Sequence, residues 1–277
     1  MTQISQTIQT NNIENQSNQL YKEAQRPSWD SVATGWQEWW KTFEKDAQKL
    51  SDHLVELAKI SSSSKVLDIA TGIGEPAITA AKKIDSRNAG HVLATDIAPQ
   101  MLSTAKQRAI SLGLQDVIEF KEGDAETISL PASTFDAALC RWGLIYLPDL
   151  RAGLFNIHRS LVDGGRLAAA VWASPDKVPF LSVVMSTVLK ETRKSPPPSG
   201  IPGPFSLADQ SIIEAALSEI GFKDIAIERM NVIFTYSSPE DYTHFHQAIL
   251  APAHALLADQ TQERREEKRY GMLLLKQ

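Results

Sequence analysis

The stretch VLDIATGIGEPAITAA, residues 66–81, decides the fold of this chain. It begins inside a short apolar run, residues 65–70, that predicts a buried strand. Gly72 and Gly74 follow in a loop, and Pro76 stands in the first turn of a helix predicted over residues 76–84. The glycine spacing is that of a loop that carries a ligand between a strand and a helix.

The alternation of strand and helix continues down the chain. Further strands are predicted at 91–96, 117–124, 135–140 and 166–173, with helices at 99–113 and 150–161 and a turn at the Asp-Gly-Gly of 163–165. This order predicts an α/β fold: a doubly wound, mostly parallel, Rossmann-like sheet with helices on both faces. Such sheets bind ligands at the carboxyl ends of their strands.

Composition argues against several classes of protein. The net charge of -5 is opposite to that of most nucleic-acid binders, and no run of about 20 apolar residues could span a membrane. The single cysteine, Cys140, fits a reducing compartment, and the Gln- and Asn-rich start does not resemble a secretory signal. We therefore expect a cytoplasmic protein. No His, Cys or Asp spacing suggests a metal site.

The glycine loop fits two ligands, and Asp68 discriminates between them. Gly72, Gly74 and Ala77 match the pattern G-x-G-x-x-A of dinucleotide sites, and the same spacing suits S-adenosylmethionine. Asp68, at the tip of the strand, would attract the ammonium of an amino acid and repel a pyrophosphate. Asp96, which ends the second strand, can bind ribose hydroxyls in either case. S-adenosylmethionine is favoured, and a nicotinamide-dependent oxidoreductase or a non-catalytic cofactor-binding scaffold are the alternatives.

Four motifs in order resemble class I S-adenosylmethionine-dependent methyltransferases, in the small-molecule branch of the ubiquinone/menaquinone C-methyltransferases. They are VLDIATGIGEPA, ATDIAPQML, EGDAETISLPASTFDAALCRWGL and LVDGGRLAAAVW, within residues 64–173. Ala70 departs from the family, where many members carry glycine. The resemblance implies three groups of cofactor contacts: Asp68, Ala70, Thr71, Gly72 and Gly74 at the methionine part; Asp96, Ile97, Met101, Asp124 and Ala125 at the ribose and adenine; Cys140 and Arg141 beside the sulfonium.

Aromatic residues suggest where a methyl acceptor would bind. The candidate substrate contacts are Trp36, Trp39, Trp142, Tyr146, Trp172 and Phe180, all beside the predicted strand ends or in the flanking segments. They could hold a small, hydrophobic or aromatic metabolite for in-line methyl transfer, or they could be packing residues. His244 and His246 are the candidate bases, although structural roles are the commoner use of such histidines. Arg141 could meet the cofactor carboxylate or pair with an acid.

The chain divides into four segments. Residues 1–24 are expected to be a disordered or weakly helical tail, and residues 25–60 a helical lid that includes an amphipathic helix at 41–59. Residues 61–236 are the expected S-adenosylmethionine-binding methyltransferase domain, with an insertion at 174–205. Within it, 207–222 reads as a helix and 223–236 as β-like. Residues 237–277 are the expected helical cap.

Overall fold

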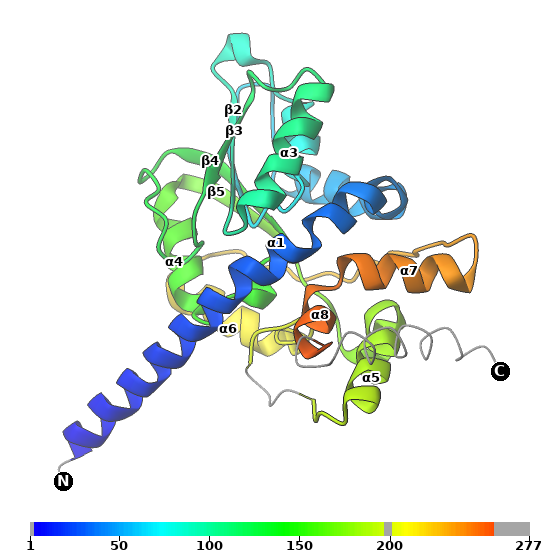
Figure 1. The fold of residues 1–277 in the computed structure, drawn as a ribbon. Coiled ribbons are helices and arrows are strands. Elements are labelled where there is room, and N and C mark those ends of the chain that lie inside the picture. The colour runs from blue at the N-terminus through cyan, green and yellow to red at the C-terminus, as the bar shows by residue number, and fades with distance from the viewer. Residues whose placement is uncertain (1–2, 197–200, 258–277) are drawn as a thin grey trace.

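Five parallel strands form the centre of the molecule. The computed structural model describes residues 3–196 and 201–257 (Figure 1). The strands are β1 (Lys65–Ile69), β2 (His91–Asp96), β3 (Ile118–Glu122), β4 (Phe135–Arg141) and β5 (Leu161–Ala170). Their order across the sheet is β3-β2-β1-β4-β5, and every neighbouring pair is parallel. The chain reverses direction across the sheet after β3, so the carboxyl ends of β1 and β4 flank the switch point, where such sheets bind ligands.

Alternate residues of each strand bury against different helical layers. Val66 of β1 lies in one apolar core with α2 (Ala77–Ala81), α3 (Pro99–Ser111) and the last turns of α1 (Gln3–Leu57). Leu67, the next residue, lies in a second core with α4 (Leu150–Ser160) and α6 (Gln210–Ile220). Because side chains alternate along a strand, the sheet is covered on both faces. The predicted doubly wound α/β fold is therefore confirmed.

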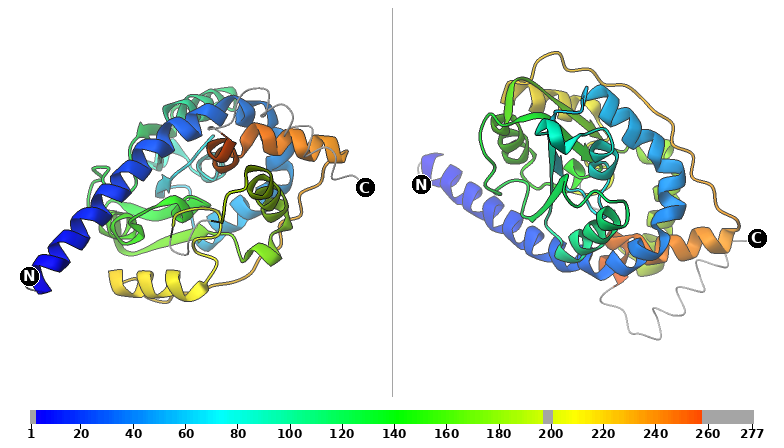
Figure 2. Two further views of the ribbon diagram at one scale, coloured as in Figure 1. Left: turned by 60° about the horizontal axis from the view of Figure 1, so that its bottom comes forward. Right: turned by 90° about the horizontal axis from the view of Figure 1, so that it is seen from above.

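Helix α1 covers the carboxyl edge of the sheet and then one of its faces. Figures 1 and 2 show it crossing the molecule as one long helix and then turning back along it. Residues 3–24 belong to the segment that was expected to be a disordered or weakly helical tail. They are helical and continuous with the segment expected to be a lid. The end of α1 enters the core through Leu50, Leu54 and Val55.

The remaining helices gather beside the carboxyl edge. They are α5 (Pro179–Thr192), within the segment expected to be an insertion, and α7 (Pro239–Ile249) and α8 (Ala251–Leu257), within the expected cap. Helix α7 packs on α1 at Gly35, where an added Cβ would come within 2.1 Å of the Ala248 carbonyl oxygen. Short 3-10 turns occupy Ser86–Asn88, Leu144–Tyr146 and Pro175–Lys177. No helix among the described residues is long and apolar enough to cross a membrane.

Two local expectations differ from the structure. The Asp-Gly-Gly turn at 163–165 lies inside β5, where the pairing with β4 shifts register and Gly164 has φ +77°. The glycines thus form a bulge rather than a separate turn. Residues 223–236 run as an extended segment along the outside of the molecule without joining the sheet (Figure 2). Residues 258–277, the last part of the expected helical cap, lie outside the described residues.

Candidate cofactor site

The ends of β1 and β2 are joined through Asp96 and the glycine loop. One carboxylate oxygen of Asp96 accepts the Gly72 N–H at 2.8 Å, and the other accepts the Ala98 N–H at 2.9 Å. Burial nevertheless raises the pKa of Asp96 to about 6, because desolvation outweighs these bonds. The arrangement holds the loop against the second strand and leaves acceptor capacity on both oxygens, since each carboxylate oxygen has two lone pairs.

Asp68 is fully buried and only half satisfied. Its Oδ2 accepts the Ala77 N–H at 3.0 Å, at the start of α2. Its Oδ1 makes no hydrogen bond within the described residues, and neither does the hydroxyl of Thr71. Burial raises the pKa of Asp68 to about 7, even though the nearby Thr71 hydroxyl, the Ala77 N–H and Arg141 favour the charged form. A buried acceptor without a donor is unfavourable by itself, so this geometry suits a cationic partner such as an ammonium.

The loop between Asp68 and α2 has the backbone that glycine permits. Gly72 has φ +56° and open space where a Cβ would stand, whereas a Cβ on Gly74, at φ +102°, would approach Ile78 Cδ1 to 2.9 Å. Ala70 also has a positive φ, of 55°. This left-handed conformation explains why a glycine suits the position of Ala70.

A cluster of buried charges lies behind the loop. The guanidinium of Arg141, at the end of β4, donates to both carboxylate oxygens of Glu44 on α1, at 2.5 and 2.8 Å, and to the Ser51 hydroxyl at 2.8 Å. Arg108 on α3 donates to the Ile73 carbonyl at 2.5 Å and pairs with Glu75 at 3.4 Å. Arg141 therefore pairs with an acid, and the acid is buried rather than on the surface. With Asp68 ionised, the cluster has three carboxylates and two guanidinium groups.

The first part of α1 lies on the residues expected at the adenine and ribose. Lys22 Nζ is 2.9 Å from Asp124 Oδ2 and also pairs with Glu126. Arg26 donates to the Ile97 carbonyl at 3.2 Å. Further along α1, Val32 and Ala33 pack with Ile73, Ala98 and Met101. Ala125 is buried, and its carbonyl accepts from the Asn156 amide at 3.1 Å.

Five of the six expected acceptor residues lie in one connected group of aromatic rings, and Tyr146 lies apart from it. Trp142 stacks on Trp172 with ring centroids 4.4 Å apart, and Trp172 contacts Phe180 at 5.9 Å. These three lie together beside the end of β4. Trp36 and Trp39 are on α1, against Phe43 and Phe245 respectively, and Tyr146 contacts Trp29 at 5.0 Å.

The two candidate histidines differ sharply in environment. His244 is exposed, whereas His246 is almost completely buried among aromatic rings. Cys140 is fully buried, and burial raises the pKa of its thiol to about 12, so it is not a nucleophile at neutral pH. No group of three or more His, Cys, Asp or Glu side chains that could hold a metal occurs among the described residues.

Several residues at the site were not predicted from the sequence. Glu75 follows Gly74 directly and could have been noticed there. Glu44 and Arg108 read as ordinary charged positions of amphipathic helices, and only the packing of α1 and α3 on the sheet brings them together with Arg141. Lys22 lies in the segment that was expected to be a tail.

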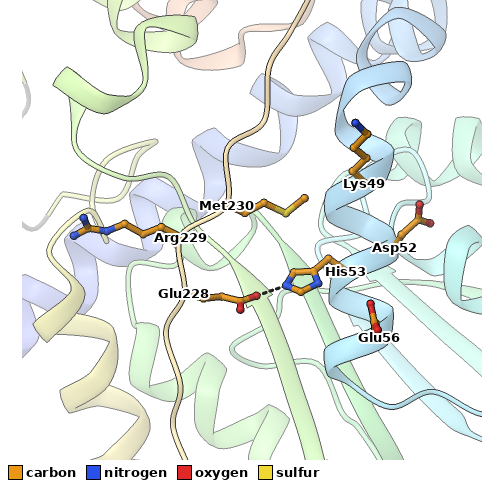
Figure 3. Close-up of a pocket in the computed structure, with 7 residues that line it drawn as sticks. All are labelled: Lys49, Asp52, His53, Glu56, Glu228, Arg229 and Met230. Atoms are coloured by element: carbon orange, nitrogen blue, oxygen red, sulfur yellow. Dashed lines mark hydrogen bonds and ion pairs between the residues drawn. The ribbon is translucent and has the colours of Figure 1, made fainter.

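A separate cavity of about 390 Å³ opens between α1 and residues 228–230 (Figure 3). Its lining is largely charged and exposed, and it is crossed by a contact between His53 and Glu228. None of the residues expected to bind the cofactor lines it. This cavity is therefore distinct from the carboxyl edge of the sheet.

Comparison with known proteins identifies the region around the glycine loop. Residues 66–165 match the family described as a methyltransferase domain. A demethylmenaquinone methyltransferase from Deinococcus radiodurans is 36% identical over 114 residues, 41% of this chain and 45% of that protein. The aklanonic acid methyltransferase DauC from Streptomyces sp. is 36% identical over 115 residues, 42% and 51% of the two chains. The chain thus spans about half the length of these relatives.

A solved structure agrees with the fold beyond the matched region. The YcgJ protein from Bacillus subtilis superposes with a TM-score of 0.54 at 19% identity, covering 79% of this chain and 88% of that one. At this identity the likeness concerns the fold alone.

Proposed function

We propose that this chain transfers a methyl group from S-adenosylmethionine to a small, hydrophobic or aromatic acceptor, because residues 66–165 match a methyltransferase domain and align with methyltransferases. The observation that carries the proposal is the buried, unpartnered Asp68 Oδ1 beside the glycine loop. An ammonium fits this atom and a pyrophosphate does not. The match to a methyltransferase domain also favours this function over the nicotinamide alternative.

The residues at the carboxyl edge would hold the cofactor in three parts. We assign the ammonium to Asp68, with the glycine loop around the methionine part, and the ribose hydroxyls to Asp96. S-adenosylmethionine supplies a methyl group already activated by its positively charged sulfur. The protein then has to orient the ligand and exclude water. The full assignment is Asp68, Ala70, Thr71, Gly72 and Gly74 for the methionine part, Asp96, Ile97, Met101, Asp124 and Ala125 for the nucleoside, and Cys140 and Arg141 beside the sulfonium.

The acceptor would bind beyond Arg141, against the rings that follow β4. Trp142, Trp172 and Phe180 form adjacent flat surfaces there. Such surfaces can align a flat molecule with the methyl group, and alignment alone lowers a barrier by roughly 7–11 kcal/mol in favourable cases. We propose in-line transfer at this place. We assign Trp36, Trp39 and Tyr146 to the surroundings of the same acceptor. The two relatives are named for different acceptors, so we assign a class of acceptor rather than one compound.

Helix α1 would act as the lid of the site. Its cationic residues Lys22 and Arg26 lie on the adenine and ribose positions, so the ligand needs this part of the helix to move. The insertion at 174–205 and the cap at 237–277 would complete the acceptor site.

Formation of S-adenosylhomocysteine tests the proposal. The protein is incubated with S-adenosylmethionine and a panel of hydroxylated aromatic compounds, and the product is measured by mass spectrometry. We expect acceptor-dependent product, and its loss in Gly72→Val. Gly113→Val is the matched control, because Gly113 also has a positive φ and open space but lies after α3, outside the loop. A protein that binds the cofactor and methylates no member of a broad panel would instead be a scaffold.

A further inference from the structure

A continuous group of aromatic rings leads from the end of β4 to helix α7. This aromatic cluster consists of Phe43, Trp142, Trp172, Phe180, Phe234 and Phe245. Phe43 touches Trp142 on one side and Phe245 on the other, with centroid distances of 5.5 and 6.0 Å. Phe180 stacks on Phe234 at 4.0 Å. Since Arg141 lies against the rings of Trp142 and Phe43, the cluster begins at the proposed cofactor site.

Two polar atoms without partners lie at the other end of this cluster. They are Nε2 of His246 and the hydroxyl of Tyr236, both buried and without a hydrogen bond among the described residues. Their rings are 6.2 Å apart. The rings of Phe180 and Phe245 lie 4.7 and 5.0 Å from that of His246, so the polar pair is continuous with the aromatic cluster.

The surroundings of His246 fix which of its nitrogens can accept. Nδ1 is 2.8 Å from the Tyr242 carbonyl oxygen, which can only accept, so Nδ1 carries the proton. Burial lowers the pKa of His246 to about 4, although the Tyr242 and Phe180 carbonyls oppose this shift. The Phe180 carbonyl accepts the Tyr242 hydroxyl at 3.1 Å and, as an acceptor, cannot donate to Nε2. At neutral pH, Nε2 is therefore an acceptor that lacks a donor.

The polar pair is unfavourable for stability as it stands. A buried donor or acceptor without a partner lowers stability, and phenylalanine in place of Tyr236 would keep the ring and avoid this. A ligand hydroxyl would satisfy both atoms at once, because it can donate to Nε2 and accept from the Tyr236 hydroxyl. A ligand carbonyl could satisfy only Tyr236. The pair is therefore complementary to a hydroxyl group.

The extended segment that carries Tyr236, residues 223–236, is attached to the rest of the molecule mainly by side chains. Residues 223–236 make no backbone–backbone hydrogen bond in the part of the chain that the structure describes. The Thr235 N–H donates instead to the Asp46 carboxylate at 2.7 Å, and Phe234 stacks on Phe43 and Phe180. This attachment allows residues 223–236 to separate from α1 and admit a flat molecule without breaking a strand ladder.

We propose that His246 Nε2 and the Tyr236 hydroxyl bind a hydroxyl group of the acceptor, at the end of the aromatic cluster remote from Arg141. The assignment rests on the proposed methyltransferase function. His246 is a positioning residue here, since the cluster separates it from the methyl group.

Binding of two probe molecules to the full chain tests the proposal. The probes are 2-naphthol and naphthalene, which differ by one hydroxyl, and binding is followed by quenching of tryptophan fluorescence. We expect wild type to prefer 2-naphthol by about tenfold, a modest share of what two hydrogen bonds can supply. Tyr236→Phe and His246→Asn should each remove most of the preference. Asparagine keeps a donor near the Tyr242 carbonyl, and His244→Asn, on the exposed side of α7, is the matched control.

Stability and cofactor binding are measured on the same proteins. Tyr236→Phe should not lower the thermal unfolding midpoint, because its hydroxyl has no partner to lose. Equal binding of the two probes by wild type, or a preference that survives in either variant, would overturn the assignment. A titration with S-adenosylmethionine separates this result from the proposed function: intact cofactor binding with no probe preference refutes the polar pair alone.

Discussion

Asp68 and the charges around it carry an excess negative charge that a positively charged ligand would neutralise. The buried cluster has one more carboxylate than guanidinium groups when Glu44, Asp68 and Glu75 are ionised against Arg108 and Arg141. Burial raises the pKa of both Asp68 and Glu75. An ammonium at the free oxygen of Asp68 would remove the imbalance and favour its charged form.

The raised pKa of Asp68 predicts opposite pH dependences for stability and for cofactor binding. The pKa of Asp68 is raised from 3.8 to about 7, so the folded chain holds this proton better than the unfolded chain does. Stability without cofactor should therefore fall as the pH rises from about 4 to about 7 and then level off. Affinity for S-adenosylmethionine should rise over the same range, because the carboxylate must be ionised. Asp96 contributes in the same direction.

Asp68→Asn isolates this contribution. The variant should bind S-adenosylmethionine at least about tenfold more weakly at pH 8, the order expected for a lost charge-assisted hydrogen bond. Its affinity should also vary less with pH. Calorimetric titrations at several pH values measure both effects, and a wild-type affinity that falls between pH 5 and pH 8 would contradict the account.

The residues of the site that the sequence predicts are those marked by local spacing. Asp68, Gly72 and Asp96 could be singled out because each stands at a fixed place relative to a strand end. The partner of Arg141 could not, because Glu44 is distant in sequence and its choice depends on how α1 packs. The free Nε2 of His246 is likewise a property of the surrounding fold.

Helix α1 is coupled to the sheet through one buried ion pair. Arg141 and Glu44 are almost fully buried and joined by two hydrogen bonds. Removal of one partner leaves an uncompensated buried charge. Glu44→Leu should therefore lower the free energy of unfolding by about 3–5 kcal/mol, and Glu44→Leu combined with Arg141→Met should recover most of this. Urea unfolding of the four proteins measures the cycle. Destabilisation of the double variant equal to the sum of the two single variants would show that the pair is not coupled.

The first part of α1 should control how fast the cofactor exchanges. Lys22 and Arg26 hold the helix over Asp124, Glu126 and Ile97. The double variant Lys22→Ala/Arg26→Ala should raise both the association and the dissociation rate by roughly fivefold, the effect of losing about 1 kcal/mol of ion pairing. The dissociation constant should change less. Stopped-flow fluorescence checks this, and Lys41→Ala on exposed α1 surface is the control. Unchanged rates would mean that α1 is not the lid.

Elements were predicted well where a local pattern decides them and poorly where pairing decides them. Strands β1, β2 and β4 were found within a residue or two, because buried apolar runs mark them. Strand β5 begins at Leu161, before the Asp-Gly-Gly, since β4 offers Phe135 as a partner there. Residues 223–236 have a β-like composition, but no neighbouring strand pairs with them among the described residues. A strand needs a partner, and composition does not supply one.

On the scale of the whole molecule, α1 connects the two proposed sites. Its first part lies over the proposed adenine and ribose positions, its middle supplies Phe43 and Glu44, and its last turns lie in the core of the sheet (Figure 1). Cofactor and acceptor would thus contact different parts of one helix. The doubly wound sheet could be predicted from strand order alone, whereas this arrangement depends on long-range packing that the sequence does not reveal.

Calorimetric titration of the full chain with S-adenosylmethionine and, separately, with NAD distinguishes the two ligands that the glycine loop fits. We expect saturable binding of S-adenosylmethionine at one site, lost in Gly72→Val and retained in Gly113→Val, and no binding of NAD. Binding of NAD with no binding of S-adenosylmethionine would contradict this expectation.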